Sequence, residues 1–68
     1  MDTGAILRAI QKDRHIAGVE IAKALNVQSQ TVSRWRSYRD MRVSDCKRLA
    51  DFFNMTLDEF VSYAILED

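Results

Sequence analysis

The chain has 68 residues, with ten basic and ten acidic side chains, one cysteine and one histidine. This length suits a single domain close to the lower limit for folding without disulfides or metals, and we expect one domain over residues 1–68. One cysteine excludes an internal disulfide, and together with one histidine it leaves too few ligands for a zinc site or a catalytic triad. We therefore expect no metal, no cofactor and no enzyme activity.

The zero net charge hides an asymmetry along the chain. All ten basic residues precede position 49, in a segment with five acids and a net charge of +5, whereas residues 49–68 contain five acids and no base. Such asymmetry suggests that one part faces a polyanion. We find neither an apolar run of ~20 residues, as a membrane helix needs, nor a signal-type beginning. We expect a cytoplasmic protein with no membrane partner.

The first half of the chain predicts two short helices. There is no proline, and no stretch alternates between apolar and polar residues for long enough to suggest a strand. The spacing of apolar residues predicts one helix over about 3–12 and another over about 17–25. Their inward-facing residues are Ile6, Leu7, Ile10, Ile21, Ala22 and Leu25. Asn26 follows, a residue type that tolerates the left-handed conformation of a tight turn.

The second half predicts three more helices, so the expected class is an all-α fold of five helices. One begins near Gln28 or Ser29 and runs to Ser37, burying Val32 and Trp35. Another covers about 43–53, and the last begins at Thr56, where Thr-Leu-Asp-Glu forms a capping box. The inward-facing residues of these last two helices are Val43, Cys46, Leu49, Ala50, Phe53, Leu57, Phe60, Val61 and Ala64.

Residues 16–35 carry the most informative pattern, which is typical of a helix-turn-helix. Two helices cross at a steep angle through a tight turn only if a small residue lies at the crossing and the turn permits positive φ. Ala22 and Asn26 meet these needs. The apolar residues that join the two helices are Ile21, Leu25, Val27, Val32 and Trp35. Each feature alone is a weak signal, but all of them in register are a strong one.

The stretch Val-Gln-Ser-Gln-Thr-Val-Ser-Arg-Trp (27–35) resembles the turn and recognition helix of the Cro/repressor proteins, the lambda-repressor-like class. Residues 47–60 resemble the fourth and fifth helices of the same family. The resemblance runs from about Ile6 to Val61, nearly the whole chain. It implies a five-helix lambda-repressor-like bundle that binds double-stranded operator DNA, commonly as a homodimer, and regulates transcription.

In this family the recognition helix enters the major groove, and its N-terminal residues meet base edges. The residues expected to read bases are Ser29, Gln30, Ser33 and Arg34. Arg34 is the first candidate for specificity and Gln30 the second, because Arg pairs bidentately with guanine and Gln with adenine. The alternative for these side chains is an ordinary solvated helix face.

The resemblance places the polar loop after this helix beside the sugar–phosphate backbone, where arginine adds salt-dependent affinity. The expected backbone contacts are Gln28, Thr31, Arg36, Ser37, Tyr38, Arg39 and Arg42. Tyr38 either donates to a phosphate or packs, and Asp40 pairs with one of the arginines. The spacing of Trp35 from Val32 favours a place in the core over a base-stacking platform, and Cys46 is expected to be a small buried hydrophobe.

The C-terminal run 60–66 has more apolar residues than one buried helix face needs. We expect Tyr63, Ile65 and Leu66 to form a dimer contact, unless the chain end packs on its own core. The function that follows is a Cro-like phage or prophage repressor that occupies an operator.

The alternative is a protein-interaction module of the same fold, an antirepressor or antitoxin. Its support is the neutral net charge and Gly18, which stands where the family usually has a phosphate-binding Gln. Ala17 likewise replaces the family's usual Thr or Ser helix cap.

Overall fold

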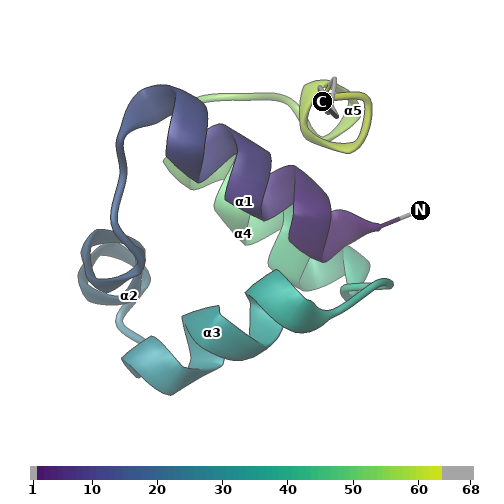
Figure 1. Ribbon diagram of the computed structural model, residues 1–68. Helices are drawn as coiled ribbons and strands as arrows, with labels where there is room; N and C mark the ends of the chain where they lie inside the picture. Colours follow the sequence, from purple (N-terminus) through teal and green to yellow (C-terminus); the bar gives the residue numbers. More distant parts are fainter. Residues whose placement is uncertain (1, 64–68) are drawn as a thin grey trace.

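Five helices follow one another along the chain, with no strand, in the computed structural model, which describes residues 2–63 (Figure 1). They are α1 (Thr3–Arg14), α2 (Gly18–Leu25), α3 (Ser29–Ser37), α4 (Val43–Phe52) and α5 (Leu57–Val61). The expected all-α class with five helices is confirmed. α3 packs against both α1 and α2, and α5 packs against α4 and α1.

A single core joins the apolar faces of the helices. The largest fully buried side chains are Phe53, Phe60, Leu7, Ile10, Ile21, Leu49 and Val32. Trp35 and Cys46 are also buried, as their spacing predicted, while Leu25, Leu57 and Val61 are partly buried against the core. Ala64 lies outside the described residues. Each helix thus contributes one apolar stripe, and burial of these stripes is the main stabilising term for a chain this small.

One residue of the predicted core is wrongly placed: the Val43 side chain is 69% exposed. Val43 is the first residue of α4, and at that end of the helix its side chain is not covered by another element. Met41, two residues earlier in the preceding loop, is buried instead. Helical periodicity did not predict the burial of Met41, because periodic spacing identifies buried residues only within a helix.

A left-handed residue follows the last turn of three helices. His15, Asn26 and Asn54 have φ of 55°, 57° and 59°. In each case the next residue donates its amide to the carbonyl five positions earlier, as Val27 does to Ala22 at 2.9 Å. These bonds satisfy carbonyl groups that lack a partner in the last turn. The prediction for Asn26 is confirmed, and the resulting turn of residues 26–28 directs α3 across α2.

The N-termini of α5 and α2 are held differently. Thr56 and Glu59 form the predicted capping box: the Thr56 hydroxyl accepts from the Glu59 amide at 3.1 Å, and the Glu59 carboxylate accepts from the Thr56 amide at 2.8 Å. α2 has no side-chain cap at Ala17, as its sequence predicted. There the Glu20 carboxylate accepts the Ala17 amide at 3.0 Å, so only one half of the reciprocal pair is made.

The N-terminus of α1 closes on the segment that follows α3. The amides of Thr3 and Gly4 donate to the carbonyl oxygens of Arg39 and Tyr38, at 3.0 and 2.8 Å. The buried Thr3 hydroxyl accepts from the Met41 amide at 2.8 Å. Free amides of a helix N-terminus thereby pair with loop carbonyls that have no secondary-structure partner. These bonds fix the backbone of residues 38–41.

Candidate nucleic-acid interface

α3 presents a polar face on the side opposite its two buried residues. Val32 and Trp35 are buried, and at 100° per residue the opposite side of the helix holds Gln30, Ser33, Arg34 and Ser37. Ser29 is exposed in the first turn. All four residues expected to read bases, Ser29, Gln30, Ser33 and Arg34, are therefore exposed on one short helix. This arrangement leaves their donors and acceptors available to a ligand.

The residues expected to contact the DNA backbone surround this face. Gln28 is exposed at the N-cap position, without a side-chain capping bond, and Thr31 is half-buried. The Ser37 hydroxyl donates to the Arg34 carbonyl at 2.8 Å, so it is turned toward its own helix. The remaining four, Arg36, Tyr38, Arg39 and Arg42, are exposed at the end of α3 and in the loop that follows.

Internal hydrogen bonds divide the arginines into two groups. The side chains of Arg8, Arg14 and Arg48 donate to the backbone carbonyls of Gly4, Phe53 and Leu25. Within residues 2–63 no side-chain hydrogen bond or ion pair engages the other four, which are Arg34, Arg36, Arg39 and Arg42. The arginines that remain available to an external anion are thus those of α3 and its following loop.

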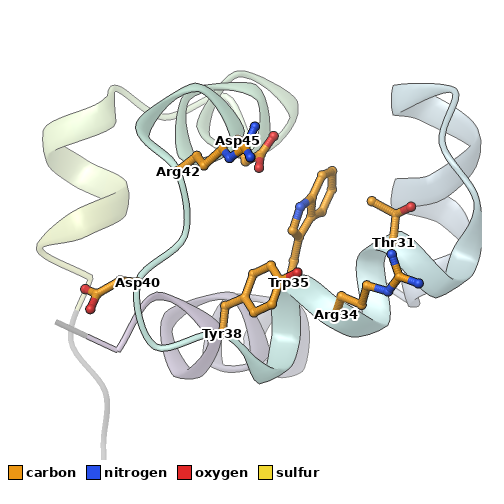
Figure 2. A pocket seen from close by; sticks show the side chains of 7 residues that line it. All are labelled: Thr31, Arg34, Trp35, Tyr38, Asp40, Arg42 and Asp45. Carbon is orange, nitrogen blue, oxygen red and sulfur yellow. The ribbon is translucent and has the colours of Figure 1, made fainter.

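A groove of about 310 Å³ lies between α3 and the beginning of α4 (Figure 2). Its lining residues are Thr31, Arg34, Trp35, Tyr38, Asp40, Arg42 and Asp45. Figure 2 shows the Trp35 ring between Thr31 on one side and Arg42 with Asp45 on the other. Within the groove the carboxylates of Asp40 and Asp45 offset the positive charges of Arg34 and Arg42. The excess positive charge of this surface therefore comes from Arg36 and Arg39, outside the groove.

Trp35 belongs to the core, as its spacing predicted. It is 4% exposed, and the Arg48 guanidinium carbon lies 5.9 Å from the centroid of its ring. A base cannot stack on a ring that the protein already covers. Tyr38 differs, because it is 45% exposed at the edge of the groove.

Within residues 2–63 the cysteine and the acidic residues show no arrangement that could support metal or redox chemistry. Cys46 is buried, and burial, followed by the charge of Asp45, raises the pKa of its thiol. A thiol held in its neutral form is a poor nucleophile and a poor ligand. In the part of the chain that the structure describes, no three His, Cys, Asp or Glu residues lie close enough together to hold a metal ion.

Of the three residues expected at a dimer contact, only Tyr63 lies within the described part of the chain. It is half-buried against the core of its own chain, and its hydroxyl donates to the Asp13 carboxylate. This bond, followed by burial and the Asp13 charge, raises the Tyr63 pKa. Ile65 and Leu66 lie outside the described residues. Tyr63 thus ties the chain that follows α5 to the end of α1.

Three residues that shape this surface were not identified from the sequence. Gly4 and Thr3 hold the loop that carries Arg39, and Arg48 contacts both α2 and α3. A glycine in a helix lowers stability by about 0.5–1 kcal/mol relative to alanine. A glycine at position 4 of a predicted helix therefore indicates that another part of the chain packs closely there. Nothing in the sequence distinguishes Arg48 from the arginines that have no internal partner.

No protein-family model, no curated protein and no solved structure matches this chain. Among residues 2–63, no helix has the length and apolar character required to span a membrane. The function of this chain is therefore inferred from the surface of α3 and its surroundings.

Proposed function

We propose that this chain is a sequence-specific DNA-binding regulator of the lambda-repressor-like helix-turn-helix type, acting as a Cro-like repressor by occupying its operator. The supporting observation is the exposed polar face of α3, bordered by arginines without internal partners. In this proposal α3 enters the major groove, where Arg34 and Gln30 read bases. A cytoplasmic location and the absence of catalysis belong to the same proposal.

The neighbouring positive charges supply the sequence-independent part of binding. Arg36, Arg39 and Arg42 extend from the end of α3 into the loop, where the bonds from Thr3 and Gly4 fix the backbone. Arginines on a fixed backbone neutralise phosphates and release counterions, which makes the affinity fall as salt rises. Contacts to phosphate orient the helix, and contacts to base edges provide the specificity.

A homodimer is part of this proposal, because one small domain makes few base contacts and two-fold pairing doubles them on half-sites one helical turn apart. The proposed contact consists of Ile65 and Leu66 with Tyr63. Sedimentation of the complex with operator DNA measures the stoichiometry. A monomer on saturated DNA would contradict the dimer without contradicting DNA binding.

The direct test is selection of bound duplexes from a random pool by the full chain. We expect enrichment of one sequence arranged as an inverted repeat, with guanine or adenine at the positions that Arg34 and Gln30 reach. Recovery of no common sequence would contradict the proposed function. The Arg34→Ala variant serves as the matched control, and we expect it to lose the enrichment while it still binds DNA weakly at low salt.

A second candidate function, binding to a protein partner, rests on α2. Gly18 offers no side chain to a phosphate, and the adjacent Val19 is 55% exposed. An antirepressor or antitoxin would use such an apolar position in a protein contact. Gly18→Gln separates the two functions: it restores a side chain that can reach a phosphate. We expect it to raise DNA affinity if α2 borders DNA, and to leave it unchanged otherwise.

A further inference from the structure

Arg48 extends from α4 and contacts both helices that precede it. Its Nη2 donates to the carbonyl oxygen of Leu25, the last residue of α2, at 2.9 Å. Its guanidinium carbon lies 5.9 Å from the centroid of the Trp35 ring on α3. A single side chain thus connects α2, α3 and α4, and we name these two contacts the Arg48 bridge.

Both ends of the Arg48 bridge lie where the orientation of α3 is determined. The Leu25 carbonyl immediately precedes Asn26, whose left-handed conformation directs the turn into α3. Carbonyls in the last turn of a helix lack intrahelical donors, and a cation at that end is favourable. Trp35 is one of the two buried residues of α3. The Arg48 bridge therefore contacts both the residue that precedes the turn, Leu25, and a buried residue of α3, Trp35.

The geometry of Arg48 differs from that of the arginines proposed to contact DNA. One of its N–H groups donates to a backbone carbonyl, and its planar group lies over an aromatic ring, whereas Arg34 and Arg36 have no such contacts within residues 2–63. We infer that Arg48 is a positioning residue, which fixes α3 for base reading and makes no phosphate contact of its own. This inference rests on the proposed function of α3.

Arg48→Lys separates the two roles, because it keeps the charge and removes the planar group. Lysine is a compact point charge, which can replace arginine at a phosphate but cannot both stack on a ring and donate in a fixed plane. If Arg48 contacted a phosphate, Arg48→Lys would bind DNA about as well as the original chain. If Arg48 positions α3, affinity falls although the net charge is unchanged.

The first measurement is equilibrium binding to a duplex enriched from the random pool, at several salt concentrations and at a temperature where every variant is folded. We expect Arg48→Lys and Arg48→Met to bind about tenfold more weakly, with the salt dependence of the original chain. Arg36→Met is the comparison variant and should reduce the salt slope by about one. Lys47→Met is the matched control on α4, because Lys47 is exposed and this substitution removes one positive charge, as Arg48→Met does.

The second measurement needs no DNA. Amide hydrogen exchange in Arg48→Lys should accelerate for α3 and for residues 26–28, while the amides of α5 keep the protection of the original chain. A general loss of stability would instead accelerate all amides that exchange through global unfolding. This comparison therefore distinguishes a positioning role from a merely stabilising one.

Three results would overturn the inference. They are binding by Arg48→Lys equal to that of the original chain, a salt slope reduced by about one in Arg48→Met, and exchange accelerated equally in α3 and α5. If the original chain enriches no duplex, the proposed function fails, and the exchange measurement alone decides whether Arg48 positions α3.

Discussion

The amide of Gly4 donates to the carbonyl oxygen of Tyr38 at 2.8 Å, which joins the first turn of α1 to the end of α3. A Cβ atom at Gly4 would lie 2.5 Å from the Arg36 carbonyl oxygen and 2.6 Å from that of Tyr38. Both neighbours are backbone atoms, which cannot rotate away as a side chain can. The absence of a side chain at Gly4 is therefore a condition for the packing of α1 on α3.

Gly4→Ala should lower the free energy of unfolding by about 2 kcal/mol, because α1 must separate from α3 to make room. Urea denaturation measures this change. Gly18→Ala is the matched control, since a Cβ there meets only Val32 Cγ1 at 3.6 Å and Gln11 Nε2 at 3.9 Å. We expect it to be neutral or to stabilise by about 0.5–1 kcal/mol. Equal destabilisation by both substitutions would contradict the role given to Gly4.

Thr3→Val should destabilise the chain by about 1–3 kcal/mol, although it preserves the shape of the side chain. The buried Thr3 hydroxyl accepts from the Met41 amide at 2.8 Å and donates to the Arg39 carbonyl at 3.3 Å. Valine leaves the buried Met41 amide without a partner, which costs its desolvation. Thermal unfolding measures the loss, and Thr3→Ser should retain most of the stability. A Thr3→Val variant as stable as the original chain would show that these bonds contribute nothing.

The bond between the hydroxyl of Tyr63 and Asp13 predicts a pH dependence. The Tyr63 pKa is raised above its ordinary value of 10.0, because ionisation removes the donor and places two negative charges together. Stability from this bond is fully present below pH 10 and is lost as the pH rises through the raised pKa. Ultraviolet titration should show Tyr63 ionising at a lower pH in Asp13→Asn than in the original chain. Identical titrations would contradict the bond.

The sequence predicted the elements of this fold better than the contacts between them. The left-handed Asn26 and the Thr56 capping box are local features, and both were confirmed, as were the apolar stripes of the described residues apart from Val43. α1 continues two residues beyond its predicted end at residue 12, to Arg14, because His15 adopts the left-handed conformation that glycine more often supplies. Helix ends determined by an unusual residue are hard to predict from residue type.

The contacts that shape the candidate interface were not predictable, because they join residues far apart in the chain. The Gly4 contact with Tyr38 spans 34 positions, and that of Arg48 with Leu25 spans 23. Val43 was predicted inward from helical spacing alone, but its exposure depends on what packs at the end of α4. Sequence spacing gave the exposed face of α3, whereas the distinction between arginines with and without internal partners required the three-dimensional structure.

The proposal that α3 reads bases through Arg34 is tested most directly by comparing binding to two duplexes. Fluorescence anisotropy with an enriched duplex and a scrambled duplex of equal composition gives the ratio of specific to non-specific affinity. We expect Arg34→Ala to lower this ratio by about 5- to 150-fold, because a bidentate base contact is worth about 1–3 kcal/mol. Arg36→Ala should weaken both affinities alike and leave the ratio unchanged. An unchanged ratio in Arg34→Ala would contradict base reading by Arg34.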